Sequence, residues 1–142
     1  MKLSRTVAYA LQATLQLAQS EKGRPVPCSQ LAAEGRMPER FLLQILRNLV
    51  THGILQSTRG VDGGYRLVRS PHDISILEVI EAIDGPIDSG MSAPDGLPEA
   101  SQSQLCHALA DVARMARQQL AAVKIANLMP PPGSPAANDG QE

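Results

Sequence analysis

Residues 57–67 read STRGVDGGYRL, and this stretch decides which fold the sequence predicts. Three glycines and one arginine lie near the tip of a predicted β-hairpin, where the missing Cβ atoms let the backbone approach a flat anionic surface. The runs Ile54 to Thr58 and Tyr65 to Arg69 are long enough to form its two antiparallel strands. A helix-turn-helix pattern lies just before the hairpin, and the combination is typical of a winged helix, a module that binds DNA.

Two helical segments supply the helix-turn-helix. A short helix is predicted from Cys28 to Ala33, and a longer one runs from Pro38 to about His52, after a tight turn at Glu34-Gly35-Arg36. Pro38 suits the first helical position, where its missing N–H is no loss. The periodicity of the longer helix turns five apolar side chains inward: Phe41, Leu42, Ile45, Leu46 and Leu49. The opposite face, which we expect in a DNA major groove, carries Arg40, Leu43, Gln44, Arg47, Asn48 and Thr51.

Two further helices are predicted, one before the helix-turn-helix and one after the hairpin. Ser4 is the expected N-cap of a helix that runs to about Ser20, with a buried stripe formed by Val7, Leu11, Leu15 and Ala18. Beyond the hairpin, Ser75 and Glu78 form a capping box that opens another helix, which ends at Gly85-Pro86. Its predicted apolar stripe consists of Leu77, Ile80 and Ile83.

The C-terminal part predicts a means of self-association. Residues Gly85 to Ser101 are rich in proline and glycine and are expected to form a mobile loop. A long helix then runs from about Ser103 to Met129, and one seam along it consists of Leu105, Leu109, Val112, Ala116, Leu120 and Val123. A lone helix with such a seam needs a partner, and a second copy of the chain is the simplest one.

These segments divide the chain into three parts. We expect a winged helix-turn-helix DNA-binding domain at 1–70, a helical linker, loop and dimerisation helix at 71–129, and a disordered tail at 130–142. The predicted fold class is mainly α with a small β-hairpin wing.

The charge is distributed unevenly between the two halves. The whole chain has a net charge of -1, but residues 1–70 hold ten basic and four acidic residues, a net charge of +6. The basic residues coincide with the predicted helix-turn-helix and hairpin, so the N-terminal half carries the positive field that phosphates attract. Double-stranded DNA is therefore the expected partner.

Other classes of protein are disfavoured by what the sequence lacks. Cys28 and Cys106 lie far apart and form no CxxC pair, which argues against a zinc ribbon or a secreted disulfide framework. No apolar run approaches the roughly 18 residues that span a bilayer, so we expect a cytoplasmic protein without a membrane partner. No catalytic triad, carboxylate pair or metal-ligand spacing is present, and an enzyme is not expected.

The chain resembles the Rrf2 family of bacterial transcription regulators. The resemblance rests on MKLSRTVAYAL at the start, MPERFLLQILRNLVTHGIL and STRGVDGGYRL in the middle, and ISILEVIEAIDGP after them, in the family's order and spacing. It implies a winged helix-turn-helix with a long C-terminal dimerisation helix that binds palindromic operators as a homodimer. It also implies that Arg59 enters the minor groove, while Arg40, Gln44 and Arg47 face bases and phosphates.

Elementary chemistry points the same way for these side chains. A narrow minor groove attracts an inserted arginine such as Arg59, Gln44 can pair with adenine, and Arg40 or Arg47 can pair with guanine. Each arginine has a plain alternative as a solvated surface residue, and Tyr65 has one as a contact between wing and core. The expected DNA-binding residues are Lys2, Arg5, Arg40, Gln44, Arg47, Arg59, Gly60, Gly63, Gly64 and Tyr65, with Lys2 and Arg5 on phosphates.

The sequence departs from the family at its metal site. Many Rrf2 members hold an iron–sulfur cluster through three cysteines before the long helix, but the loop from Gly85 to Leu105 has none. Only Cys106 lies near the place of the last one, and the adjacent His107 points about 100° away from it on a helix. A cluster needs about four ligands, so we expect neither a cofactor nor a metal. Mixed ligation that uses residues of a partner subunit stays open.

Two other roles remain open for Cys106. It is a redox-sensing thiol if it lies near a helix start, where the dipole lowers a thiol pKa, or it is a small apolar residue under the wing or at the dimer seam. The leading hypothesis is a homodimeric DNA-binding regulator without the usual cluster. The alternatives are an iron–sulfur or thiol sensor that uses Cys106 and His107, and a winged helix whose basic surface docks an acidic protein. The operator, the regulated genes and the effector are not predicted.

Overall fold

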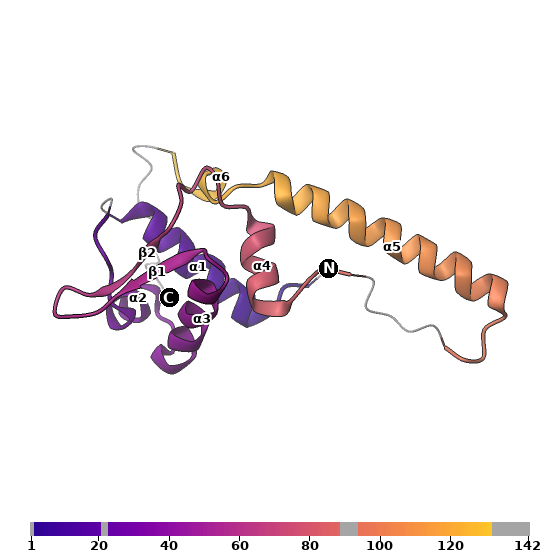
Figure 1. Ribbon diagram of the computed structural model, residues 1–142, viewed down its shortest axis with the longest axis horizontal. Helices are drawn as coiled ribbons and strands as arrows, with labels where there is room; N and C mark the ends of the chain where they lie inside the picture. Colours follow the sequence, from indigo (N-terminus) through magenta and orange to yellow (C-terminus); the bar gives the residue numbers. More distant parts are fainter. Residues whose placement is uncertain (1, 21–22, 89–93, 132–142) are drawn as a thin grey trace, which may run out of the picture.

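The computed structural model describes residues 2–20, 23–88 and 94–131. A body of short helices and one hairpin lies at one end, and a single long helix extends from it as an arm (Figure 1). The fold class predicted from the sequence, mainly helical with a β-hairpin wing and a long C-terminal helix, is confirmed. The elements are α1 (Arg5–Gln19), α2 (Cys28–Gly35), α3 (Glu39–Thr51), β1 (Leu55–Thr58), β2 (Gly64–Leu67), α4 (Ile76–Asp84), α5 (Glu99–Ala122) and α6 (Ile125–Leu128).

Helix α1 lies at the centre of the body and packs against α3 and α4. Its N-cap is Ser4 as predicted, because the Ser4 hydroxyl accepts a hydrogen bond from the Val7 amide at 3.1 Å. The predicted buried stripe is only partly right, since three of its members are half-buried at the border of the core: Leu11, Leu15 and Ala18. The side chains that are buried are Val7, Ala10, Ala13, Thr14 and Leu17. Small alanines occupy this face because two helices approach α1 closely there.

Helix α3 follows α2 after a turn in which Arg36 adopts the left-handed conformation, with φ of 53°. Pro38 is the N-cap residue of α3, so the helix begins at Glu39, one residue later than predicted. Four of the five predicted core residues are buried, namely Leu42, Ile45, Leu46 and Leu49. The prediction for Phe41 is wrong, because its side chain is 68% exposed. Each helical residue turns by about 100°, which leaves Phe41 about a quarter turn from the centre of the buried face.

The hairpin is antiparallel, with Leu55 opposite Leu67 and Thr58 opposite Gly64. Its strands are shorter than predicted, since neither Ile54 nor Arg69 belongs to one. The hairpin is tied to the body at a third segment, which the sequence did not predict. The amide and carbonyl of Val26 each bond to Tyr65 at 2.9 Å.

Helix α4 begins with the predicted capping box. The Ser75 hydroxyl accepts from the Glu78 amide at 3.1 Å, and the Glu78 carboxylate accepts from the Ser75 amide at 2.9 Å. The helix is rotated from the expected orientation, because its buried residues are Val79, Ile80 and Ala82 while the predicted Leu77 and Ile83 are half-buried. Helices α1 and α3 both pack against α4, and these contacts determine which of its side chains are buried.

The C-terminal helix is not continuous, and its predicted end at Met129 is wrong. Helix α5 starts at Glu99, inside the predicted loop, and ends at Ala122. The chain is extended at Val123, whose carbonyl accepts from the Ile76 amide at 2.9 Å, and the Ile125 amide bonds to Ile74 at 2.8 Å. Ile125 is fully buried as α6 packs against α1. The predicted tail and the centre of the predicted loop lie largely outside the described residues, at 132–142 and 89–93.

Candidate nucleic-acid interface

The outer face of α3 carries a straight row of exposed polar side chains. Arg40, Gln44, Arg47 and Thr51 follow one another at spacings of four, three and four residues, which places them on one side of a helix. The buried residues lie on the opposite side, so the core fixes the rotation of α3 about its axis. Gln44 donates to the Asn48 side chain at 3.3 Å, which orients its amide along the helix. The structure therefore brings the three predicted base-reading residues into one row.

The wing presents Arg59 as an exposed side chain just before its tip. The tip itself is a turn in which the Gly63 amide bonds to the Gly60 carbonyl at 3.0 Å. Gly60 has φ of 113°, and a Cβ on Gly63 would lie 2.3 Å from the Thr58 carbonyl oxygen. Both glycines are therefore required by the turn that follows Arg59, whether or not they approach a ligand.

Gly64 and Tyr65 attach the wing to the body. Gly64 has φ of 152°, and a Cβ there would lie 2.4 Å from the backbone of Val26. Tyr65 bonds to Val26 through its backbone and packs its half-buried side chain against the core. The contact role that the sequence left open for Tyr65 is thus present in the structure. The sequence did not predict that Val26 attaches the wing to the body. The one available signal was its position as an apolar residue between Pro25 and Pro27.

A groove of about 690 Å³ separates α3 from the wing. Arg47 and Thr51 line it from α3, and Arg59 lines it from the wing. Cys28 lies at its base, with its sulfur 3.8 Å from the Glu39 carbonyl. Burial raises the pKa of the Cys28 thiol, and the nearby Glu39 carboxylate adds to that increase. Cys28 is therefore a protonated, packed thiol at neutral pH.

The arginines of this region differ from those elsewhere in their partners. Among the residues that the structure describes, Arg40, Arg47 and Arg59 form no ion pair with a carboxylate. By contrast, three arginines outside the interface are paired: Arg69 with Glu78, Arg114 with Asp111, and Arg117 with Glu81. Guanidinium groups that protein carboxylates leave unpaired are available to phosphates and base edges.

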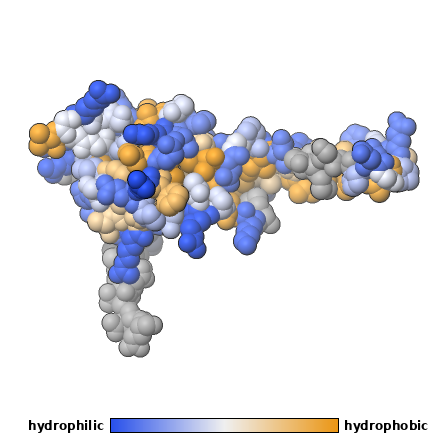
Figure 2. Space-filling view, turned by 90° about the horizontal axis from the view of Figure 1, so that it is seen from below, coloured by the Kyte–Doolittle hydropathy of each residue, from blue (hydrophilic) through white to orange (hydrophobic). Residues whose placement is uncertain are grey.

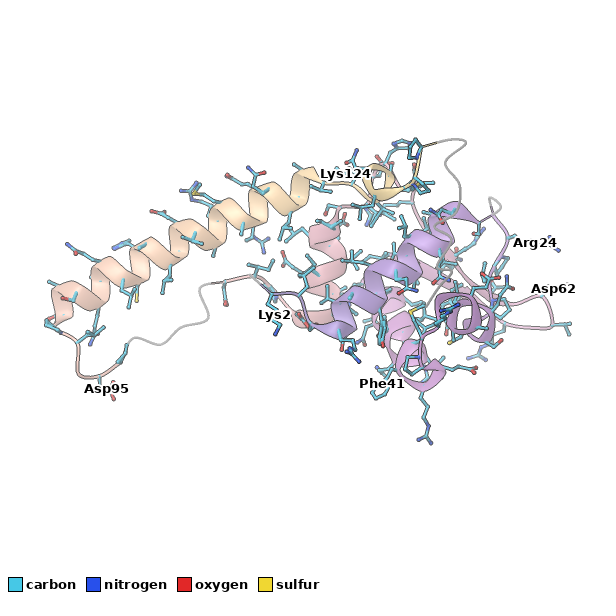
Figure 3. The ribbon with its side chains drawn as sticks, turned by 180° about the vertical axis from the view of Figure 1, so that it is seen from behind. Lys2, Arg24, Phe41, Asp62, Asp95 and Lys124 are labelled. Atoms are coloured by element: carbon cyan, nitrogen blue, oxygen red, sulfur yellow. The ribbon has the colours of Figure 1, made fainter. Side chains whose placement is uncertain are left out.

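Lys2 and Arg5 lie at the start of α1, and both are exposed. Figure 3 shows Lys2 beside this helix end, Phe41 at the lower edge of the body and Asp62 at the wing. Ser4, between the two basic residues, bonds to the Asp84 carboxylate at 3.4 Å. The N-terminal basic residues are therefore held next to the end of α4 rather than inside the groove between α3 and the wing.

The predicted dimerisation seam lies on a helix that buries nothing within one chain. No residue of α5 is buried, and Val112 and Met115 are 63% and 60% exposed. Beside the seam, Arg117 of α5 pairs with Glu81 of α4, and Ala110 and Ala113 line a hollow with Ile87 and Asp88. Leu105, Leu109, Ala116 and Leu120 are half-buried, and Val123 lies beyond the end of α5. Apolar residues are visible among polar ones along this arm (Figure 2).

The two remaining candidates, Cys106 and His107, are exposed on the arm. Cys106 does not lie near a helix start, because α5 begins at Glu99 and Cys106 follows about two turns later. His107 uses its Nδ1 in a contact of 2.9 Å with the Ser103 carbonyl of the same helix. Cys106 is also not under the wing, since α5 and the wing lie at opposite ends of the molecule (Figure 1).

These residues do not fit an iron–sulfur cluster held within one chain. The sequence has two cysteines, of which Cys28 belongs to the body and Cys106 to the arm. Across residues 2–20, 23–88 and 94–131, no group of three or more histidine, cysteine or acidic side chains could hold a metal ion. A cluster needs about four such ligands around one position.

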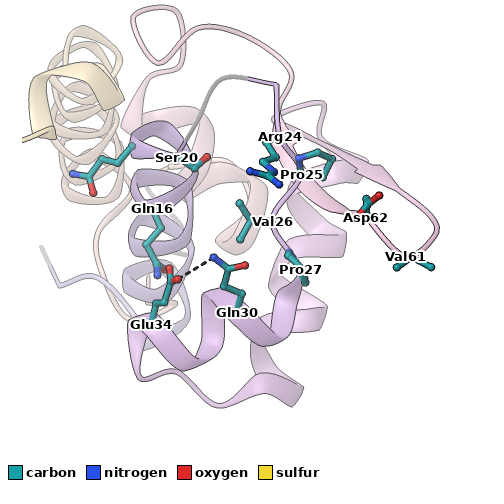
Figure 4. Close-up of a pocket in the computed structure, with 12 residues that line it drawn as sticks. Gln16, Ser20, Arg24, Pro25, Val26, Pro27, Gln30, Glu34, Val61 and Asp62 are labelled. Atoms are coloured by element: carbon teal, nitrogen blue, oxygen red, sulfur yellow. Dashed lines mark hydrogen bonds between the residues drawn. The ribbon is translucent and has the colours of Figure 1, made fainter.

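A second hollow, of about 850 Å³, lies on the other side of the wing attachment (Figure 4). Gln16 of α1, Gln30 and Glu34 of α2, and Asp62 of the wing line it. Gln30 donates to Glu34 at 2.9 Å, and the Gln16 amide donates to the Leu31 carbonyl at 3.3 Å. Arg24 also lines this hollow, opposite the face of the wing that carries the groove with α3.

None of the helices in the described part of the chain is long and apolar enough to cross a bilayer.

Comparison with known proteins agrees with this geometry. A model of the Rrf2 family, described as an iron-dependent transcriptional regulator, matches residues 3–131. A Mycobacterium tuberculosis protein that carries the name of an HTH-type transcriptional regulator is 39% identical over 123 residues, which cover 87% of this chain and 75% of that protein. The HTH-type transcriptional regulator IscR of Escherichia coli is 30% identical over 109 residues, or 77% of this chain and 67% of that protein. The structure of CymR, the global cysteine regulator of B. subtilis, has the same fold, with a TM-score of 0.73 and 23% identity over 90% of this chain and 95% of that one.

Proposed function

The chain belongs to the Rrf2 family of DNA-binding transcriptional regulators, not to a family of enzymes, and on this premise we propose that it binds a palindromic operator as a homodimer. The observation that carries the proposal is the exposed row of α3, whose arginines pair with no carboxylate among the described residues, beside the exposed Arg59 of the wing. A duplex offers phosphates and base edges to both elements at once, because a recognition helix lies in the major groove while a wing follows the backbone beside it.

Each side chain has a role that its chemistry supports. Gln44 pairs with adenine, and Arg40 or Arg47 pairs with guanine, through two hydrogen bonds in each case. Arg59 enters the minor groove, where a narrow groove concentrates negative potential. Lys2 and Arg5 contact phosphates at the margin. Gly60, Gly63, Gly64 and Tyr65 give the wing the shape that holds Arg59 outward, as their turn and backbone contacts indicate.

Binding to DNA selected from a random library tests the interface. We expect Arg59→Ala to weaken binding to the selected sequence about five- to hundredfold, the cost of one well-placed arginine contact. Arg114→Ala is the matched control, since Arg114 is exposed on α5 outside the interface. Fluorescence anisotropy at several salt concentrations measures both. Equal affinities for selected and random DNA, with no effect of Arg59→Ala, would reject the proposal.

The apolar seam of α5, which one chain covers only in part, supports the homodimer. Two copies that pair along Leu105, Leu109, Val112 and Leu120 would remove exposed apolar surface from water, which is the main favourable term in association. We expect Val112→Asp to shift the protein toward monomer at least about tenfold, since pairing would bury an unpaired carboxylate. Gln118→Asp adds the same charge on the opposite side of the helix and should leave the mass unchanged. Analytical ultracentrifugation distinguishes the two; a wild-type monomer would contradict the dimer.

We further propose that regulation does not use the iron–sulfur cluster that the resemblance to the family implies. The two cysteines lie in different parts of the fold, which supports this reading. Protein purified without oxygen should be colourless and contain far less than one iron per chain. Brown protein with stoichiometric iron and sulfide would contradict it, and loss of the colour in Cys106→Ser would then identify Cys106 as a ligand.

A further inference from the structure

The exposure of the Phe41 side chain is not explained by any contact with the core or with another described residue. It is the single phenylalanine of the sequence, and its side chain is 68% exposed on the first turns of α3. A large apolar side chain in water forgoes the free energy that burial would provide. Single exposed apolar residues are common on protein surfaces, so it is the location of Phe41 beside the exposed row of α3 that makes it informative.

The surroundings of Phe41 are those of the proposed interface. Arg40 precedes it and Gln44 follows one turn later, and both are exposed. Figure 3 shows Phe41 at the lower edge of the body, away from α6 and the arm. Recognition helices place their N-terminal residues against base edges. Phe41 is therefore positioned at the end of α3 that reaches furthest into a major groove.

The chemistry of the side chain limits what it can recognise there. A phenyl ring has no hydrogen-bond donor or acceptor, so it cannot pair with the polar atoms of a base edge. The major groove presents one apolar group, the C5-methyl of thymine, and an apolar side chain contacts it favourably. We propose that Phe41 reads a thymine in each half-site through its methyl group, next to the bases that Arg40 and Gln44 contact. The inference rests on the proposed function, because it needs α3 to lie in the major groove.

Replacing single thymines by deoxyuridine tests this contact, since the exchange removes one methyl group and leaves the pairing atoms unchanged. Wild-type protein first selects its sequence from random DNA, and each thymine of that sequence is then exchanged in turn. We expect one symmetry-related position at which the exchange weakens wild-type binding about three- to fivefold, the effect of one buried methyl group. At that position Phe41→Ala should bind thymine and uracil DNA equally.

Two further variants separate recognition from folding. Phe41→Leu keeps an apolar side chain and should retain part of the preference for thymine. Phe41→Ala should unfold at the temperature of the wild type, because the ring is exposed. If the wild type selects no sequence, both the function and this inference fail. If it selects one but uracil binds as well as thymine at every position, or Phe41→Ala keeps the preference, the inference alone is overturned.

Discussion

The body and the arm of this protein differ in how they use apolar residues. In the body, α1 alone buries five of its fifteen residues, and the core contains leucines, isoleucines and valines that are almost completely inaccessible. In the arm, α5 has 24 residues and buries none of them. The body is therefore stable through contacts within one chain, whereas the arm carries an apolar seam that a single chain covers only in part.

This difference predicts where substitutions act. A change in the body should be measured as a loss of folding free energy, and a comparable change on the arm should leave the fold intact.

The largest difference is expected for Ile125. Although it follows the arm in sequence, it is fully buried in the body, so Ile125→Ala should lower the free energy of unfolding by about 2–4 kcal/mol. Met115→Ala removes an exposed side chain that lies about a quarter turn from the proposed seam, and it should change that value by less than about 0.5 kcal/mol. Urea denaturation followed by circular dichroism measures both. Similar losses for the two variants would remove the distinction between body and arm.

A smaller difference is expected between two glycines. Gly64→Ala places a Cβ 2.4 Å from the Val26 backbone, which should separate the wing from the body at a cost of about 1–3 kcal/mol. Gly96→Ala, in the loop before α5, meets open space and should change stability by less than about 0.5 kcal/mol. DNA binding should weaken only in the first variant. Unchanged melting of Gly64→Ala would show that the wing attachment contributes little to folding.

The ion pairs should differ mainly in their response to acid. Burial tends to raise the pKa of Glu78, but hydrogen bonds from Arg69 and Ser75 outweigh it and hold that pKa below its usual value. A lowered carboxyl pKa contributes stability above the unfolded value of about 4.5, and this contribution is lost as the pH falls through the folded value.

Glu78→Gln should therefore destabilise the protein at neutral pH by less than about 1 kcal/mol, since both partners are partly exposed, and should reduce its sensitivity to acid below about pH 4.5. Asp111→Asn removes the exposed ion pair with Arg114 on the arm and should change neither the stability at neutral pH nor the sensitivity to acid. Thermal melts from pH 3 to pH 7 provide the test. An identical acid response in Glu78→Gln and wild type would contradict the role of this carboxylate.

The two cysteines offer a comparison of rate rather than of stability. Cys28 has a raised pKa and is half-buried beneath the wing, while Cys106 is exposed on the arm. Cys28 should react with a disulfide reagent about tenfold more slowly than Cys106. The variants Cys28→Ser and Cys106→Ser assign the fast and slow phases. Two phases of equal rate would mean that Cys28 is more accessible than its packing indicates.

Local signals in the sequence predicted most elements of the body. The Ser4 cap, the Ser75–Glu78 capping box and the glycine-rich turn act within a few residues, so they can be recognised without knowledge of the fold. The exposed row of α3 was also predictable, since helical spacing alone places Arg40, Gln44 and Arg47 on one side. The prediction for Phe41 was wrong because helical spacing shows which residues lie near one side of a helix but not how far around the helix the buried face extends.

The sequence by itself determined which segments become helix or hairpin and where the basic charge lies, because caps, glycines and periodicity act between near neighbours. Tertiary structure decided how far each helix is rotated and where the last one stops. Val123 is extended and Ile125 is buried because partners at residues 74–76, far away along the chain, bond to this segment. Such contacts form only when the body folds, so no local sequence pattern predicts them.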